Sequence, residues 1–188
     1  MTQDHGIANM QELLSSIATA AKEKTSYYFD MNYLREQKTS LMLDTKTSNT
    51  DKSRNCGVKI RVWDGEKFLE QGTDILTREH LEEKLNSLLK QADDNQETIK
   101  HYEELTDDTN SIQGTYGPSI EQDITSWNID EKYHRLQELH EQIHQQKPDL
   151  LNLRCVYRET IDEHLFVNAH KCMSQRVPVV LIAYIGFV

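Results

Sequence analysis

The chain has 188 residues and is strongly acidic, with 31 Asp and Glu against 21 Lys and Arg, for a formal net charge of -10. A chain of this length can bury a core, and one domain is the usual outcome at this size. Its negative charge repels phosphate backbones and anionic lipid headgroups, so we expect neither nucleic acid nor a membrane as a partner. Three cysteines without CxxC spacing or a signal peptide indicate reduced thiols and a cytoplasmic protein: Cys56, Cys155 and Cys172.

The first part of the chain predicts a helix followed by strands. Met10–Ala21 carries apolar residues at helical spacing, and Asn9 with Glu12 predicts a capping box at its start. Residues 27–73 then become rich in aromatic and β-branched side chains, with period-two alternation. Asp64–Gly65 is typical of a tight hairpin turn. We therefore expect three or four antiparallel strands after the first helix.

Two further helices are predicted in the middle of the chain. One begins after Thr77, a capping residue, and is expected to continue, after a break near Asp93, to about Leu105. The other follows Asn128, which forms a capping box with Glu131, and ends before Pro148. Residues 106–127, which lie between these helices, contain Gly and Pro without periodicity and predict a long mobile loop.

Three strand-like segments close the chain, at residues 150–159, 164–169 and 176–187. The apolar run Val177–Val188 is far shorter than the ~20 residues needed to cross a bilayer as a helix, so we interpret it as a strand. A terminal strand this apolar is expected either to lie centrally in the sheet or to be followed by more protein. Together the pattern predicts a single α+β domain over residues 1–188, with an antiparallel β-sheet packed against amphipathic helices.

The acidic surplus is local, since eleven acidic residues and the single base Lys100 lie between Asp93 and Glu131. Such a run could attract a metal ion or a cationic partner. A solvated, self-repelling connector is the more common role of like-charge runs, and we adopt that interpretation.

The sharpest chemical motif is His140-Glu141-Gln142-Ile143-His144, an HExxH on a predicted helix. Two imidazoles at i and i+4 can share a zinc ion while the glutamate acts as a general base. Glu163 follows at a spacing suited to a third ligand, although its surroundings predict a strand turn. The helix is so rich in His, Glu and Gln that composition alone explains the motif, so we assign no metal ligand, no cofactor site and no catalytic residue to this chain.

The other candidate residues give weaker indications of a catalytic or binding site. There is no GxSxG, P-loop or GxGxxG motif, and the cysteines lack a basic or His-paired sequence context. His164 and His170 flank a predicted strand, where surface histidines are common. Trp63 and Trp127 lack interleaved Lys and Arg, so we expect core or interface roles.

The segment Cys56–Ala92, CGVKIRVWDGEKFLEQGTDILTREHLEEKLNSLLKQA, resembles the N-terminal domain of the TldD/PmbA family, formerly called modulators of DNA gyrase and regarded as metallopeptidases. The most specific part is Gly57–Gly65, a Gly-Val-x-Ile-Arg-Val strand followed by an Asp-Gly turn. The order of elements agrees over most of the chain. Two departures are Lys59, where the family has a small residue, and NAHKC at residues 168–172, where it has Asn, Ser and a nearby Gly.

The resemblance implies a two-lobed, dimer-forming protein that holds an extended peptide in a cleft and cuts it at a zinc ion. In that family the zinc is held by an HExxxH helix of the C-terminal half. The HEQIH of His140–His144 is one residue shorter and lies in the other half. The family's zinc ligands are therefore not carried over, and zinc is implied only for a full-length protein.

By this resemblance the chain is the N-terminal half of such a protein, a substrate-handling and assembly domain that is not catalytic alone and serves peptide maturation or proteolysis. The implied partners are a peptide or unfolded protein substrate and a second subunit, in a homodimer or a heterodimer with a related chain. Two alternatives stay open at this point: a self-contained HExxH zinc hydrolase and a non-catalytic peptide-binding interaction module.

Because residues 106–127 combine acidic side chains with a lack of apolar periodicity, we expect limited proteolysis to cut there first. Mass spectrometry of the earliest fragments measures this. Initial cleavage within residues 57–73 would contradict the proposed organisation.

Overall fold

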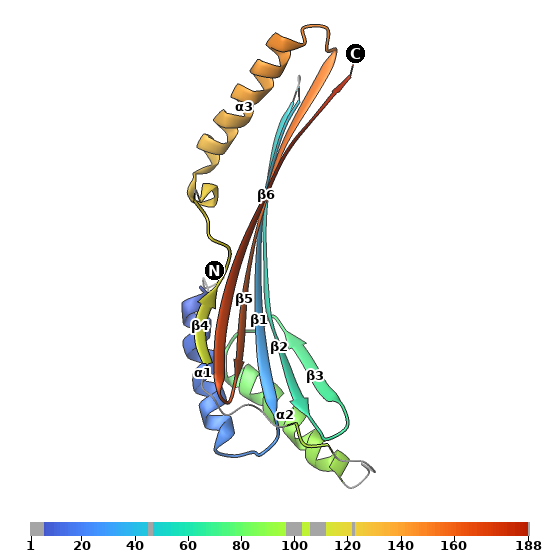
Figure 1. Cartoon of the computed structure of the whole chain (residues 1–188). Helices are drawn as coiled ribbons and strands as arrows, with labels where there is room; N and C mark the ends of the chain where they lie inside the picture. The colour runs from blue at the N-terminus through green and yellow to red at the C-terminus, as the bar shows by residue number, and fades with distance from the viewer. Residues whose placement is uncertain (1–5, 45–46, 97–102, 106–111, 122, 188) are drawn as a thin grey trace. The chain divides into compact units, whose positions relative to one another are not determined.

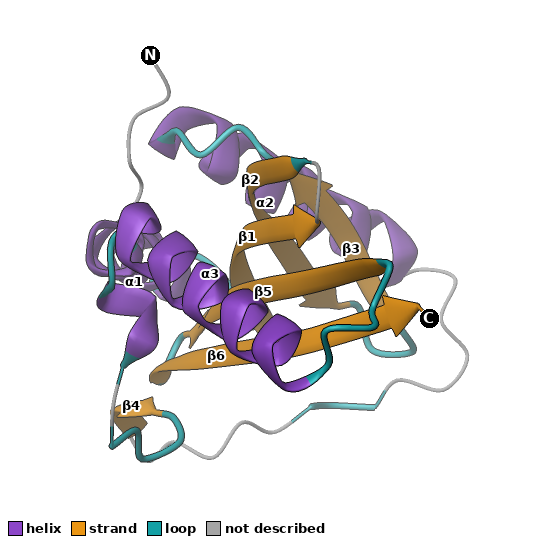
Figure 2. Cartoon of the chain, turned by 90° about the horizontal axis from the view of Figure 1, so that it is seen from above, coloured by secondary structure: helices purple, strands orange, loops and turns teal. Residues whose placement is uncertain are grey.

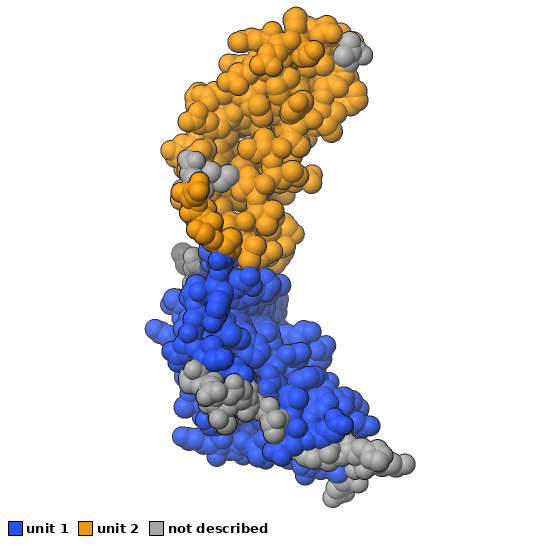
Figure 3. All heavy atoms as spheres, viewed as in Figure 1, with its two compact units in different colours: residues 1–35, 56–117, 163–176 blue, residues 36–55, 118–162, 177–188 orange. Residues whose placement is uncertain are grey.

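The computed structural model describes residues 6–44, 47–96, 103–105, 112–121 and 123–187. These residues form two compact units, drawn in different colours in Figure 3. Unit 1 comprises residues 1–35, 56–117 and 163–176, and unit 2 comprises residues 36–55, 118–162 and 177–188. Within the described part of the chain, no helix has both the length and the apolar character needed to cross a membrane. Whether the two units unfold as the single predicted domain stays a prediction.

Six strands form one mostly antiparallel sheet in the order β3-β2-β1-β5-β6-β4, and the α+β fold class predicted from the sequence is confirmed (Figures 1 and 2). Four of the strands are 16 or 17 residues long, well beyond the usual three to ten. Each of these four contributes residues to both units. Their bounds are β1 Phe29–Asp44, β2 Ser48–Trp63, β5 Asn152–Asn168 and β6 Lys171–Phe187.

The strand predictions were right in type but too fragmented. The segments predicted at residues 150–159 and 164–169 belong to one strand, β5, and the third segment lies in β6. In β5 the buried positions recur at period two from Leu153 to Glu159 and again from Glu163 to Val167, with the half-buried Ile161 in the same register between them, so no turn separates the two segments. The chain reverses only after Asn168, whose Oδ1 accepts hydrogen bonds from the amides of His170 at 2.9 Å and Lys171 at 2.7 Å.

In unit 1 two helices pack against the sheet, α1 (Ile7–Lys22) and α2 (Arg78–Gln96). Their apolar stripes contact inward side chains of several strands. The α1 cap was predicted wrongly, because the helix begins earlier, after Gly6, and no side chain caps it. The α2 cap is confirmed, since Thr77 Oγ1 accepts from the amide of His80 at 3.4 Å. The core includes Met10, Leu14, Ile17, Phe29, Met31, Tyr33, Val58, Ile60, Val62, Leu81, Leu85, Leu88, Leu165 and Val167.

The strand alternation predicted around Gly57 is confirmed in the antiparallel pair of β2 and β3 (Phe68–Thr73). Val58, Ile60 and Val62 are buried on one side. On the other side Arg61 forms a two-point ion pair with the fully buried Asp30, at 2.9 and 2.7 Å. This hydrogen-bonded partner raises the pKa of Arg61.

The turn between β2 and β3 depends on Asp64 and Gly65, as predicted. Gly65 has a φ of 110°, a conformation that side chains with a Cβ rarely adopt. Asp64 Oδ1 accepts from the amides of Glu66 at 3.0 Å and Lys67 at 2.9 Å, and its Oδ2 accepts from Asn95 Nδ2 at 2.8 Å. Burial opposes ionisation of Asp64, but these hydrogen bonds outweigh it and lower its pKa.

The segment at residues 106–127, predicted as a loop, contains regular structure. Ile112–Tyr116 forms the short strand β4, which pairs parallel with residues 171–175 of β6, and Ile124–Ser126 forms the 3-10 helix η1. The β4 segment is too short and polar to show a period. Residues 106–111 lie outside the described part, so the mobility of this segment stays a prediction. The break predicted near Asp93 is wrong, because α2 is continuous to Gln96. The predicted extension of α2 fails at residues 103–105, which are not helical, while residues 97–102 lie outside the described part.

In unit 2 one helix, α3 (Ile129–Gln146), packs on the strands. Its predicted capping box is confirmed, because Asn128 accepts from the amide of Glu131 at 2.9 Å and Glu131 accepts from the amide of Asn128 at 2.8 Å. The helix ends before Pro148 as predicted. Its apolar stripe forms a second, smaller core with Leu41, Leu153, Cys155 and Tyr157.

We expect Asp64→Ala to destabilise the protein by about 1–3 kcal/mol, because it removes the buried carboxylate that accepts from the turn amides of Glu66 and Lys67 and from Asn95. The pKa of Asp64 is lower in the folded chain than its ordinary value of 3.8, so its ionised form stabilises the fold above that value and the effect is lost as the pH falls below it. The stability difference from wild type should therefore shrink at low pH. Urea unfolding at several pH values measures this.

The matched control is Asp51→Ala, which removes an exposed carboxylate of β2 and should have little effect. An Asp64→Ala protein as stable as wild type at neutral pH would contradict the role of the turn.

Candidate functional site

One edge of the sheet in unit 2 is formed by the second half of β6. Strand β4 pairs only with residues 171–175, and residues 177–187 have β5 on one side. Among the described residues, no strand covers their other side. Pro178 fits this position, because a proline that lacks an amide hydrogen is tolerated at a sheet edge. Residues 177–187 therefore form an open edge.

This edge is also unusually apolar. Six large apolar side chains there are between 52% and 63% exposed, and no charged residue interrupts them between Arg176 and Phe187. Sheet edges in soluble proteins usually carry charges or bulges that prevent pairing with another chain. The exposed side chains are Val179, Leu181, Ile182, Tyr184, Ile185 and Phe187.

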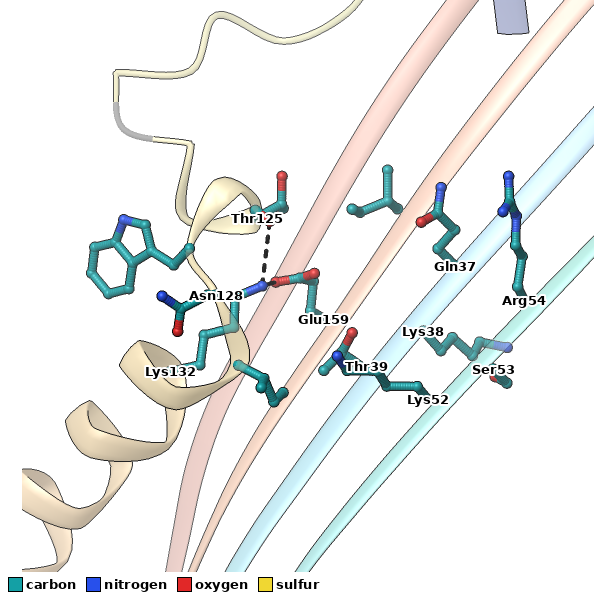
Figure 4. A pocket seen from close by; sticks show the side chains of 13 residues that line it. Gln37, Lys38, Thr39, Lys52, Ser53, Arg54, Thr125, Asn128, Lys132 and Glu159 are labelled. Atoms are coloured by element: carbon teal, nitrogen blue, oxygen red, sulfur yellow. Dashed lines mark hydrogen bonds and ion pairs between the residues drawn. The ribbon is translucent and has the colours of Figure 1, made fainter. Parts of the chain in front are cut away.

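A cavity of about 600 Å³ lies in unit 2 beside the start of α3 (Figure 4). We call it the chamber. Its walls come from β1, β2, β5, η1 and the first turn of α3. Most of its side chains are polar or charged: Gln37, Lys38, Thr39, Lys52, Ser53, Arg54, Thr125, Trp127, Asn128, Ile129, Lys132, Glu159 and Ile161.

At one wall of the chamber, two opposite charges are buried together. Lys132 is 6% exposed and Glu159 is 4% exposed, and Lys132 Nζ lies 2.8 Å from Glu159 Oε2. Lys132 also donates to the carbonyl of Thr125 at 3.3 Å, as the dashed lines in Figure 4 show. Tyr157 donates its hydroxyl proton to Glu159 at 2.5 Å. Burial, together with this hydrogen bond, raises the pKa of Tyr157 well above its usual range, so the hydroxyl stays protonated.

A second cavity of about 260 Å³, which we call the slot, shares Trp127 and Lys132 with the chamber. Its other walls are mainly apolar, and Ile182 brings the open edge of β6 into its lining. Arg135 lies over the Trp127 ring, with its Cζ 6.0 Å from the ring centre. The remaining lining residues are Leu136, Leu139 and Tyr157.

The HExxH residues lie on α3 but do not gather into a metal site. The rings of His140 and His144 meet edge to face with centres 5.1 Å apart, and the buried Nε2 of His140 has no hydrogen-bond partner among the described residues. Glu141 is exposed. Across the described residues, no group of three His, Cys, Asp or Glu side chains is placed to hold a metal ion. The chain's described residues therefore do not fit a zinc site.

The other residues singled out in the sequence form no metal site among the described residues. Glu163, the considered third ligand, is paired with Arg35 in unit 1. His170 Nδ1 lies 3.3 Å from Lys22 Nζ, and His164 is exposed. Burial raises the pKa of the Cys155 thiol, which makes it a poor nucleophile.

Lys132 and Glu159 were not among the predicted site residues, although the sequence contains a signal for both. Lys132 lies one turn before Leu136 on the apolar stripe of α3. Glu159 continues the inward series that begins at Leu153 in β5. A charged residue at a periodic apolar position indicates a buried, paired charge.

Comparison with known proteins shows that the chain is similar in structure to several solved proteins. No family model matches the sequence, and no curated protein matches it. A candidate modulator of a DNA gyrase from Thermotoga maritima has a TM-score of 0.62 at 15% identity, covering 92% of this chain and 38% of that one. A second candidate modulator, from Bacteroides thetaiotaomicron, has a TM-score of 0.57 at 12% identity, covering 95% and 40%.

TldE from Thermococcus kodakarensis is similar to the chain with a TM-score of 0.55 at 10% identity, covering 93% of this chain and 42% of that one. The chain therefore spans about two fifths of the length of these structures. At such identities the likeness concerns the fold, and it confirms the resemblance drawn from the sequence at that level.

We expect Lys132→Met to destabilise the protein by about 3–5 kcal/mol, because it leaves Glu159 buried without its counter-charge. Adding Glu159→Gln should recover part of this loss, so the two effects are not additive. Urea unfolding of both single variants and the double variant measures the coupling. The control is the exposed pair Arg78–Glu82, where the corresponding changes should cost about 1 kcal/mol or less. Equal costs at the two pairs would show that the buried pair is unimportant.

Proposed function

We propose, from the TldD/PmbA type of fold, that this chain is the substrate-handling and assembly domain of a two-lobed zinc metallopeptidase of the cytoplasm. In this proposal it is not catalytic alone. The reaction it serves is peptide maturation or proteolysis, and a second lobe supplies the zinc ion. Its partners are a peptide or unfolded protein and a second subunit, either an identical chain or a related one.

Two observations support the proposal that this chain assists a separate catalytic lobe. The chain matches only about two fifths of each similar structure. Its described residues also offer no set of three metal ligands, and the imidazoles of His140 and His144 have no third ligand beside them. These facts favour an assisting domain over a self-contained HExxH hydrolase.

The open edge of β6 carries the proposal. An extended peptide can add to a sheet edge as a further strand, with backbone hydrogen bonds giving affinity and alternate side-chain contacts giving selectivity. Residues 177–187 offer such an edge, and their exposed apolar side chains would be covered by an added strand. A bound peptide and a second subunit would both pair with the edge through backbone hydrogen bonds, so the edge suits either partner. A non-catalytic interaction module would use the same edge, and it differs only in lacking a peptidase lobe.

The test uses the self-association of the purified chain. We expect the wild type to form dimers or larger species by light scattering, because several exposed apolar side chains are each worth about 1.5–3 kcal/mol when buried. Ile185→Lys should shift the protein to a monomer and leave its circular dichroism spectrum unchanged. Ile182→Lys changes the opposite face of β6, beside the slot, and should destabilise unit 2 instead.

The matched control is Ile75→Lys, since Ile75 is 51% exposed, close to the 55% of Ile185, but lies in the loop before α2. This variant should associate as the wild type does. A wild-type monomer that tolerates both β6 lysines without loss of fold would sink the proposal, because the strand would then be neither core nor interface.

A further inference from the structure

The chamber and the slot together have the properties of a recognition site. They are adjacent cavities in unit 2 that share the side chains of Trp127 and Lys132. One is lined mainly by charged and polar groups and the other mainly by apolar groups. A ligand that fills both must therefore carry a charged group and an apolar group close together.

The charge of the chamber is opposite to that of the protein. The chain carries a formal charge of -10, yet the chamber is lined by four basic side chains, Lys38, Lys52, Arg54 and Lys132, and by the single acid Glu159. The charge of Lys132 is balanced by Glu159. Lys38 Nζ lies 2.8 Å from Glu36 Oε2 and lowers the pKa of that carboxyl.

When Glu36 is added to the walls, four basic side chains still stand against two acidic ones. Lys52 and Arg54 are both exposed and follow one another closely along β2. In Figure 4 they lie on the strand that faces the Lys132 wall across the chamber. A concave surface lined by one sign of charge concentrates ligands of the opposite sign. The chamber therefore suits an anion.

The neighbouring slot decides which kind of anion fits. Leu136, Leu139 and Ile182 give it apolar walls, and its volume of about 260 Å³ is below that of a typical small-molecule pocket. It suits one bulky apolar side chain. Thr39 adds a hydroxyl to the chamber that can pair with a peptide backbone. Free phosphate or a free carboxylate would leave the slot empty.

We propose that the chamber and the slot select acidic peptide segments, with side-chain carboxylates in the chamber and a neighbouring apolar side chain in the slot. This inference rests on the proposed function, and it adds a substrate class to it. Ile182 links the slot to the open edge of β6, so a segment held in the slot enters along the strand that the proposed function uses.

Fluorescence anisotropy with the whole chain tests the inference, using a short fluorescein-labelled peptide in which a leucine is flanked by glutamates. Two matched peptides carry glutamines in place of the glutamates, or alanine in place of the leucine. We expect the acidic leucine peptide to bind tightest and to weaken as salt rises.

Lys52→Glu should weaken binding of the acidic peptide at least roughly fivefold, because it reverses a charge at the chamber wall. Leu139→Gln should weaken the leucine peptide and leave the alanine peptide unchanged. The matched control is Lys90→Glu, which changes the net charge equally on an exposed position of α2 in unit 1. This control should bind as the wild type does.

The outcomes separate the inference from the proposed function. If all three peptides bind equally and only Ile185→Lys abolishes binding, the open edge binds peptides and the inference is overturned. If glutamate or phosphate alone displaces the peptide at equal concentration, the chamber is a small-anion site and the peptide class is wrong. If no peptide binds while self-association through β6 persists, the inference fails and only the assembly role is left.

Discussion

In unit 2 a single helix covers one face of four long strands, and its limited width determines which parts of that face stay exposed. Four neighbouring strands about 4.8 Å apart form a face roughly 15–20 Å across, whereas a helix with its side chains is about 10–12 Å wide. Helix α3 packs on β1, β5 and part of β6 through Leu41, Leu153 and Val180. It leaves residues 48–55 of β2 and most of residues 179–187 of β6 exposed. Unit 1, by contrast, has two helices in its core.

The two uncovered margins differ in chemistry. Residues 48–55 of β2 are polar or charged, so their exposure needs no partner and supplies the basic wall of the chamber. The exposed part of β6 is apolar and its outer edge is open, which is the kind of surface that other chains cover. The molecule therefore places a charged wall and an apolar edge on either side of the same helix.

The buried pair of Lys132 and Glu159 connects these features. A buried charge is tolerated only with a partner, and here each is the partner of the other, while the Thr125 carbonyl and the Tyr157 hydroxyl add a further hydrogen bond to each. The pair ties the first turn of α3 to β5 at the boundary of the chamber and the slot. Hydrophobic side chains at both positions would hold the helix as well, but they would remove the polar wall from the chamber.

The sequence by itself determined the elements whose signals are local: the apolar stripes of the three helices, the Asn128–Glu131 capping box and the Asp64–Gly65 turn. The order of helix and strand patterns also predicted the α+β fold class, and the stretch around Gly57 indicated the type of fold. The sequence also identified the apolar β6 segment. Only the tertiary structure decided that the strands are continuous, that β4 pairs parallel with β6, and that His140 and His144 lack a third ligand among the described residues. The meeting of Lys132 with Glu159, 27 positions apart in the chain, was likewise decided there. Caps and turns depend on neighbours along the chain, whereas cavities and ion pairs depend on which distant segments the sheet brings together.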